Sequence, residues 1–261
     1  MKVLFFDIDG TLIDAKGRVP LSAARAIALT RKKGNKVIIN SGRCMAGIPK
    51  VVRDLKPDGY VCGCGTAVYL DGKTLFHSTL PKDLCRKILL ENREKGYAGQ
   101  MEGETVTWFD LCCRKIPWVQ FAKMFWMFKD SARLIGKKVP ADFQFDKFFV
   151  LGTPQADLEG LAKIAGPTME VIPREQGCAE IVQRGCSKAT GMDLICQELG
   201  VTLDDCYAFG DSNNDIPMLE HITHSVAMGG LNGDILPYCE YQTTTLENHG
   251  IYNALKHYGL I

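Results

Sequence analysis

The sequence lacks the features that mark a membrane, secreted or nucleic-acid-binding protein. No apolar run approaches the roughly 18 residues of a membrane-spanning helix. Asp7 and Asp9 interrupt the apolar N-terminus before it reaches the length of a signal peptide. The 31 Lys and Arg residues nearly match the 30 Asp and Glu residues, whereas nucleic-acid binders are usually basic. We therefore expect a cytoplasmic globular protein that has neither membrane nor nucleic acid among its partners.

Cysteine spacings typical of structural zinc sites are also missing. The 11 cysteines contain no CxxC pair; Cys62 and Cys64 are two apart, and Cys112 and Cys113 are adjacent. Their odd number and irregular spacing argue against a disulfide framework. We expect reduced thiols that pack as small apolar side chains.

Short apolar runs alternate with helical patterns at both ends of the chain. The runs at 2–6, 37–39, 60–62 and 206–209 have the composition of buried strands. Between the first two, Ser22 is a candidate cap for a helix that ends at Gly34. A second helix would begin after Ser187 and end at Gly200. The order strand, helix, strand predicts a doubly wound α/β fold with a parallel sheet.

The middle of the chain differs and predicts an inserted second domain. It holds all three tryptophans and strand-like runs at 148–151 and 179–182. Apolar residues at spacings of three and four predict one helical face, formed by Trp118, Phe121, Ala122, Phe125, Phe128, Ala132 and Ile135. We expect an α+β domain at 81–185, inserted into a core of residues 1–80 and 186–261.

The inserted segment also contains a basic stretch. Residues 114–138 carry seven Lys and Arg residues against one acidic residue, Asp130. We interpret this stretch as a solvated helix face, and the aromatic residues as core packing. The alternatives are a positive surface that attracts phosphorylated substrates and a stacking platform. The segment 175–178 is a candidate loop facing the site.

Polar residues follow the predicted strands directly, at the edge where open α/β sheets bind ligands. Asp7 and Asp9 are two residues apart, so in an extended chain their side chains project to the same side. Two adjacent carboxylates require a compensating cation or proton. The pair suits covalent phosphoryl transfer, in which one carboxylate attacks phosphorus, the other transfers protons and Mg²⁺ offsets the charge.

Three further sites favour the same chemistry. Ser41 and Gly42 offer a hydroxyl and a main-chain N–H to phosphate oxygens. Lys188 opposes the dipole of the helix that it begins, which is understandable beside an anion. The turn at 210–215 is rich in oxygen ligands for a hard cation such as Mg²⁺, although it lacks the spacing of an EF-hand.

Together, the sequence DIDGT at 7–11, Ser41, Lys188 and GDSNND at 210–215 resemble the motifs of the haloacid dehalogenase superfamily of phosphohydrolases. The insertion lies where the Cof-type subfamily carries a large α/β cap. The segments 227–229 and 249–251 add to the resemblance. It implies a HAD-like Rossmannoid core, a substrate-specificity cap and a Mg²⁺-dependent phosphatase.

The resemblance also implies roles for individual residues. Asp7 matches the nucleophile that forms an aspartyl-phosphate, and Asp9 matches the general acid and base. The implied Mg²⁺ ligands are the Asp7 carboxylate, the Asp9 carbonyl and Asp211, with Asp215 in support. The implied phosphate-binding residues are Gly10, Thr11, Ser41, Gly42, Lys188 and Asn214.

Three departures from the family pattern stand beside these matches. Asn40 replaces the usual Ala or Thr, Cys64 replaces Asn before Gly65, and 229–231 reads Gly-Gly-Leu instead of Gly-Asn-Ala. We expect none of them to touch the catalytic set. We expect them instead to alter the side of the pocket that receives the leaving group.

The sequence motifs are compatible with several functions. A phosphotransferase or phosphomutase would share every core motif, and a non-enzymatic receiver-like signalling domain is a third reading. The substrate is expected to be a small phosphorylated metabolite of the sugar phosphate, pyridoxal phosphate, flavin mononucleotide or nucleotide type. The oligomeric state is unknown.

Overall fold

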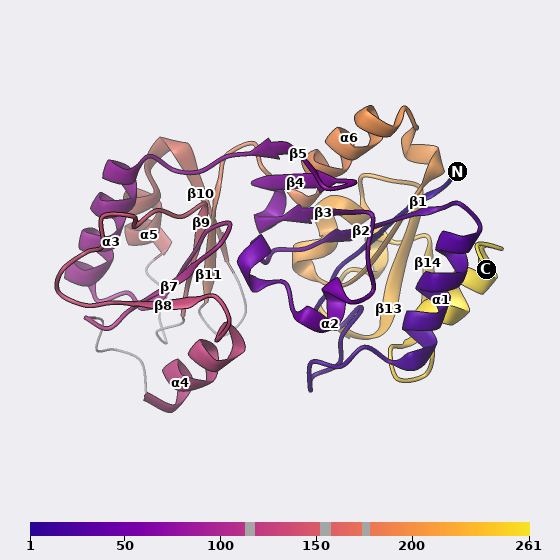
Figure 1. Ribbon diagram of the computed structural model, residues 1–261, viewed down its shortest axis with the longest axis horizontal. Coiled ribbons are helices and arrows are strands. Elements are labelled where there is room, and N and C mark those ends of the chain that lie inside the picture. The colour runs from indigo at the N-terminus through magenta and orange to yellow at the C-terminus, as the bar shows by residue number, and fades with distance from the viewer. Residues whose placement is uncertain (113–117, 152–157, 174–177) are drawn as a thin grey trace. The chain divides into compact units, whose positions relative to one another are not determined.

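The chain folds into two compact units, one inserted into the other. The computed structural model describes residues 1–112, 118–151, 158–173 and 178–261 (Figure 1). Unit 1 contains Met1–Gly42, Ile48–Phe76 and Ser187–Ile261, and unit 2 contains Arg43–Gly47 and His77–Cys186. Unit 2 thus begins at His77 where we expected Pro81, and it also includes a short segment that directly follows Gly42.

Unit 1 contains an eight-stranded sheet in the order β14-β13-β12-β1-β2-β3-β4-β5. The strands from β14 to β3 pair in parallel, and β4 is antiparallel to β3. Their bounds are β1 Val3–Phe6, β2 Lys36–Asn40, β3 Gly59–Cys62, β4 Ala67–Leu70, β5 Lys73–His77, β12 Cys206–Ser212, β13 His224–Asn232 and β14 Tyr241–Thr245.

Helices cover both faces of this sheet, which confirms the doubly wound α/β prediction (Figure 1). Two helices that pack together, α1 and α8, lie on one face, and α6 and α7 lie on the other. All four residues of β1 are fully buried, as expected for a strand covered on both faces. The helices are α1 Leu21–Lys32, α2 Lys50–Arg53, α6 Lys188–Leu199, α7 Ile216–Leu219 and α8 Gly250–His257. The short 3-10 segments are Gly63–Gly65, Leu203–Asp205, Asn213–Asp215 and Leu236–Tyr238.

The predicted start of α6 is confirmed, whereas that of α1 is wrong. The Ser187 hydroxyl accepts a hydrogen bond from the Thr190 amide at 3.1 Å, and the Thr190 hydroxyl accepts one from the Ser187 amide at 2.9 Å. This reciprocal capping box satisfies amides that a helix start otherwise leaves unpaired. In α1 the N-cap is Pro20, without a side-chain cap. Ser22 already lies inside the helix, so its hydroxyl cannot take the capping position.

Unit 2 is an α/β structure around a six-stranded sheet in the order β10-β11-β9-β6-β7-β8. All neighbours pair antiparallel except β7 and β8, which are parallel. Helices α3 and α5 bury apolar side chains against one sheet face. No helix within the described ranges is long and apolar enough to cross a bilayer. The strands are β6 Gly99–Glu102, β7 Thr107–Asp110, β8 Ala132–Ile135, β9 Lys147–Val150, β10 Met169–Pro173 and β11 Ala179–Gln183; the helices are α3 Lys82–Lys95, α4 Trp118–Met127 and α5 Leu158–Ala165, with 3-10 segments Met45–Gly47 and Gly166–Thr168.

The long helical face predicted between Trp118 and Ile135 is only partly correct. Helix α4 ends at Met127, and Ala132 and Ile135 belong to strand β8. Pairing with β7 buries Ile135 completely, so strand pairing takes over where the spacing alone would continue the helix. Two aromatic residues of α4 pack as core, because Phe109 lies 5.9 Å from the ring of Phe121 and 5.6 Å from that of Phe125, whereas Trp126 is 70% exposed.

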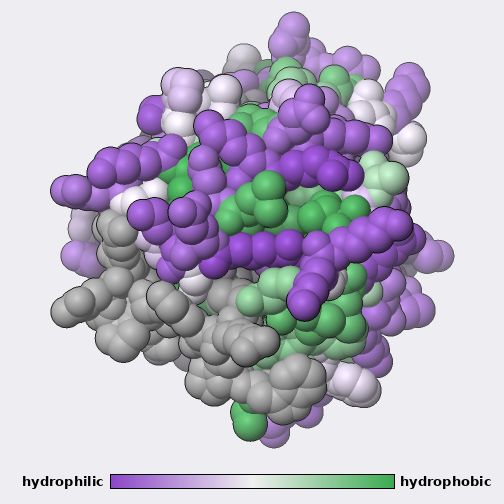
Figure 2. Space-filling view, turned by 90° about the vertical axis from the view of Figure 1, so that its left-hand side faces the viewer, coloured by the Kyte–Doolittle hydropathy of each residue, from purple (hydrophilic) through white to green (hydrophobic). Residues whose placement is uncertain are grey.

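Four basic residues of this stretch are exposed, namely Lys129, Arg133, Lys137 and Lys138. Lys129 lies 4.7 Å above the ring of Trp126, and Arg133 forms an ion pair with Asp142 at 3.1 Å. Figure 2 shows the left-hand side of Figure 1, where hydrophilic and hydrophobic residues are interspersed. These contacts agree with a solvated surface. Arg114 and Lys115 lie outside the described residues, and so do residues 175–177 of the candidate loop at 175–178.

The side chain of Asp58 connects α1 with strand β2 and yields a stability prediction. Burial alone would raise the pKa of this carboxyl, but hydrogen bonds from Arg31 and the Val37 amide and the nearby Lys36 hold it below its usual value. The Arg31 guanidinium bonds both carboxylate oxygens at 3.1 Å. A depressed pKa contributes stability above the unfolded value of about 3.9, and this stability is lost as pH falls through the folded value.

We expect Asp58→Asn to lower the free energy of unfolding by about 2 kcal/mol at neutral pH. Urea unfolding from pH 7 to pH 3 should show the difference from the wild type shrinking only below about pH 4. The exposed Asp71, which pairs with Lys36 at 2.8 Å, is the control. Asp71→Asn should cost less than about 1 kcal/mol, and an equal loss in both variants would contradict the prediction.

Candidate active site

The four predicted motifs meet where strand order reverses in the unit 1 sheet. Strand β1 lies between β12 and β2. The chain continues from β1 to β2 on one side, and the later strand β12 pairs with β1 on the other side. Ligands bind outside the carboxyl ends of strands at such a switch point. Asp7 directly follows β1, Ser41 follows β2, and Asp211 is the penultimate residue of β12. Lys188 is the first residue of α6.

A buried ion cluster forms the centre of this region. The Lys188 Nζ atom lies 2.6 Å from Asp7 Oδ1 and 2.5 Å from Asp215 Oδ1. The three residues are at most 4% exposed. Burial disfavours the charged form of Lys188, but the two carboxylates outweigh it and raise its pKa above the usual value. The lysine is therefore held as a cation between two acids.

The carboxylates of this cluster outnumber the cation. Oxygen atoms of Asp7, Asp211 and Asp215 lie within 4.8 Å of one another, and all three residues are buried. Burial and the neighbouring Asp215 raise the pKa of Asp7 well above its usual value, against the opposing effect of Lys188. Three buried carboxylates and one ammonium leave an excess of negative charge. This hard-oxygen donor set fits a divalent cation such as Mg²⁺.

The loop after β12 is organised by Asp215. Its Oδ2 atom accepts hydrogen bonds from the amides of Asp211 at 2.9 Å and Ser212 at 3.1 Å. The Ser212 hydroxyl bonds Asn214 Oδ1 at 2.5 Å. Ser212 and Asp215 also form a capping box. Asp215 thus shapes the loop with one oxygen and holds Lys188 with the other.

The Gly-Thr pair after the two aspartates has a structural reason. Gly10 has a φ of +83°, and a Cβ atom there would lie 2.2 Å from Asp211 Oδ2. Only glycine tolerates both the backbone conformation and this approach. The Thr11 hydroxyl donates to Asp211 Oδ1 at 3.2 Å. Both residues therefore position the carboxylate of Asp211.

The remaining predicted site residues belong to the same motifs as the residues of the ion cluster or follow strand β2. Ser41 is 2% exposed, and its amide donates to the Val61 carbonyl at 2.8 Å. Gly42 and Asn214 are half-buried. The Asp9 side chain is exposed and lies outside the group of three carboxylates. Asp9 is expected to bind the metal through its main-chain carbonyl oxygen. Its side chain is expected to act in proton transfer.

Two residues of this region were missed by the sequence reasoning. Asn40 was expected not to touch the catalytic set, but its Nδ2 atom donates to the Lys188 carbonyl oxygen at 3.1 Å; this expectation was wrong because the contact joins residues distant in the chain. Ser212 was assigned no role. Its signal was readable, since Ser-x-x-Asp is the pattern of a capping box.

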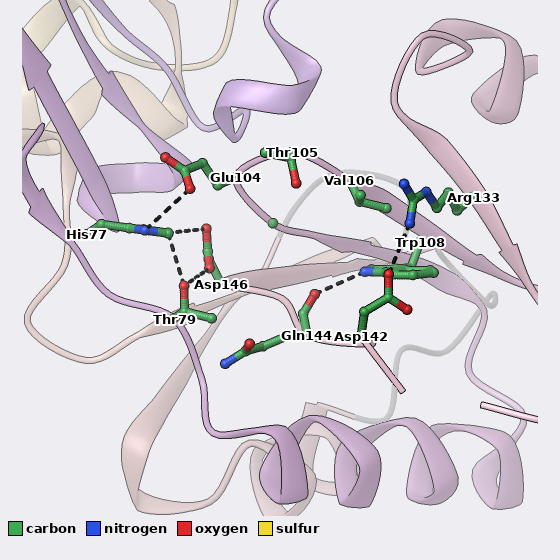
Figure 3. Close-up of a pocket in the computed structure, with 11 residues that line it drawn as sticks. His77, Thr79, Glu104, Thr105, Val106, Trp108, Arg133, Asp142, Gln144 and Asp146 are labelled. Carbon is green, nitrogen blue, oxygen red and sulfur yellow. Dashed lines mark hydrogen bonds and ion pairs between the residues drawn. The ribbon is translucent and has the colours of Figure 1, made fainter. Parts of the chain in front are cut away.

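A separate pocket of about 370 Å³ lies within unit 2 and is lined by none of the predicted site residues. Figure 3 shows His77, Thr79 and Asp146 joined at its wall. Asp146 accepts a hydrogen bond from Thr79 at 2.7 Å and lies 3.1 Å from the His77 ring. Burial raises the pKa of Asp146. These contacts provide hydrogen-bond partners for the buried carboxylate of Asp146. We therefore assign the cluster a structural role.

Comparisons with known proteins agree with this geometry. The model of the haloacid dehalogenase-like hydrolase family matches residues 4–255. Phosphatase YwpJ of Bacillus subtilis is 24% identical and covers 98% of this chain and 99% of its own. HMP-PP phosphatase of Escherichia fergusonii is 24% identical over 97% of this chain and 92% of its own.

A solved structure extends the likeness to the whole fold. The HAD subclass IIB sugar phosphatase BT4131 is 26% identical, with a TM-score of 0.83 and full coverage of both chains. The family model covers nearly the whole sequence, including both units. The chain therefore belongs to the haloacid dehalogenase-like hydrolases, as a phosphatase of the Cof type that carries a large α/β insertion.

Proposed function

We propose that the protein is a Mg²⁺-dependent phosphatase of small phosphorylated metabolites that works through an aspartyl-phosphate on Asp7. The observation that carries the proposal is the buried cluster in which Lys188 joins Asp7 and Asp215 beside Asp211. Phosphoryl transfer depends mainly on positioning and on neutralising charge. A cation held between two carboxylates, next to further acidic ligands, serves both needs.

In the first half-reaction, a carboxylate oxygen of Asp7 attacks the phosphorus of the substrate. The ester P–O bond breaks, and Asp9 gives its proton to the leaving alkoxide. Lys188 stabilises the charge on the transferring group and keeps Asp7 oriented, since its ammonium lies 2.6 Å from Asp7 Oδ1. Ser41, Gly42 and Asn214 hold the phosphoryl oxygens.

In the second half-reaction, Asp9 accepts a proton from water and the water oxygen attacks the aspartyl-phosphate. The bond between phosphorus and Asp7 breaks, which releases inorganic phosphate and restores the carboxylate. Bound Mg²⁺ would be held by the Asp7 and Asp211 carboxylates and the Asp9 carbonyl, and would offset negative charge on the phosphoryl group.

Unit 2 supplies the substrate specificity in this proposal. Relatives with the same insertion include a sugar phosphatase and an HMP-PP phosphatase, which supports a small phosphorylated metabolite as the substrate. A screen should include sugar phosphates, pyridoxal phosphate, flavin mononucleotide and nucleotides. Free phosphate in amounts equal to the dephosphorylated product would support hydrolysis. An isomerised phosphate ester without free phosphate would instead indicate a phosphomutase.

Removal of divalent metal tests the metal dependence. Treatment with EDTA should lower turnover of p-nitrophenyl phosphate at least about 100-fold, because the excess carboxylate charge would then repel the substrate. Added Mg²⁺ should restore the activity, whereas added Na⁺ of equal ionic strength should not. Full turnover by the metal-stripped protein would contradict this part of the proposal.

A further inference from the structure

We infer that Asn40 is a positioning residue for catalysis, which fixes the main chain of Lys188 from the neighbouring strand. Asn40 is the last residue of β2 and is fully buried. Its Nδ2 atom donates a hydrogen bond to the carbonyl oxygen of Lys188 at 3.1 Å, across 148 positions of sequence. The inference rests on the proposed role of Lys188 and deepens it.

The ammonium of Lys188 needs such an anchor because of the length of its side chain. Four rotatable methylene groups separate the main chain from Nζ, which must stay between Asp7 and Asp215. A small shift at the Lys188 main chain would therefore alter both ion contacts. Misplacement of a catalytic group by about 1 Å can cost on the order of 100-fold in rate.

Other contacts also restrain the start of α6, but Asn40 supplies the hydrogen bond that connects it with β2. The capping box of Ser187 and Thr190 fixes the helix end along its own chain. A Cβ atom on Gly65 would lie 2.3 Å from the Ser187 carbonyl, and one on Gly191 would lie 2.2 Å from the Val61 side chain. These close approaches limit the distance to β3 and the following turn. The amide of Asn40 adds a directional bond to β2.

The second observation is an unpaired atom on the same side chain. Asn40 Oδ1 is buried and accepts no hydrogen bond from any described residue. A buried acceptor without a partner costs stability. The orientation of the amide is fixed, because only the NH₂ group can face a carbonyl oxygen. The protein thus keeps a residue that lowers stability at one atom while its other atom holds Lys188, which is typical of a functional constraint.

The variant Asn40→Leu separates function from stability. Leucine has the same branching and number of side-chain heavy atoms, has no donor for the Lys188 carbonyl and removes the unpaired oxygen. We expect kcat for p-nitrophenyl phosphate to fall about tenfold, with KM changed by less than about twofold. The Tm should not decrease, since the carbonyl of a helical residue also accepts from the amide four residues later. Asn40→Ala should show the same kinetic change.

Two inhibitors give a readout that a purely structural role would not move. Orthovanadate adopts the five-coordinate geometry of the transition state, and inorganic phosphate resembles the ground state. In Asn40→Leu the Ki for orthovanadate should rise in parallel with the loss of kcat/KM, while the Ki for phosphate should change by less than about twofold.

The control is Asn92 in α3 of unit 2, which is 3% exposed and also has an unpaired buried Oδ1. Asn92→Leu should leave kcat and both Ki values unchanged. Wild-type kinetics in Asn40→Leu, or a fall in kcat matched by a fall in Tm with equal changes in both Ki values, would overturn the inference. Absence of turnover by the wild-type protein on every phosphate ester would overturn the proposed function as well.

Discussion

Asp7→Asn should lower kcat for a phosphate monoester at least about 10⁴-fold, the largest effect expected from a single substitution in this protein. The amide has almost the same shape as the carboxylate but cannot act as the attacking nucleophile. Its neighbours would stay in place, because Lys188 retains its contact with Asp215 at 2.5 Å. The measurement is steady-state turnover of p-nitrophenyl phosphate together with trapping of the phosphorylated protein.

The stability of this variant distinguishes a chemical effect from a folding defect. Three buried carboxylates face one ammonium, so removal of one negative charge should leave the free energy of unfolding unchanged or raise it. Trapped phosphate should be found on the wild-type chain and be absent from Asp7→Asn. The control Asp54→Asn changes an exposed carboxylate paired with Lys50 and should keep full activity. Full turnover by Asp7→Asn would remove Asp7 as the nucleophile.

The core of the fold was predictable because its signals are local. Strands β1, β2 and β12 of the parallel sheet appear in the sequence as short apolar runs, and each run is followed by polar residues of the site. Helix α6 is marked by Ser187 at its start and Gly200 at its end, and both signals act within a few residues. Local chemistry therefore identified the site motifs and their order.

The features that escaped prediction depend on contacts between distant segments. The spacing of apolar residues continues past Met127, but pairing of β8 with β7 decides that Ile135 lies in a strand. The contact of Asn40 with Lys188 cannot be read from either neighbourhood alone. The same holds for the segment Arg43–Gly47, which packs with unit 2 because the Cys44 amide bonds Glu102 Oε2 at 3.3 Å.

Lys188→Met should be the second most damaging substitution, and it should affect both stability and catalysis. Methionine fills a similar volume, but it leaves Asp7 and Asp215 buried without their cation. Breaking a buried ion pair from one side typically costs about 3–5 kcal/mol, and we expect a loss of this size in urea unfolding. We expect kcat to fall about 10³-fold as well, because the ammonium stabilises the transferring phosphoryl group.

A double variant separates these two effects. Adding Asp215→Asn to Lys188→Met removes one of the two unpaired charges while the amide keeps most of the shape of the carboxylate, so part of the lost stability should return. Catalysis should not recover, since no cation is restored. The exposed Lys50→Met, at a side chain 75% exposed, should change neither property. Recovery of kcat together with stability in the double variant would mean that Lys188 acts only by neutralising Asp215. If stability returns without turnover, the charge of Lys188 is needed for phosphoryl transfer itself.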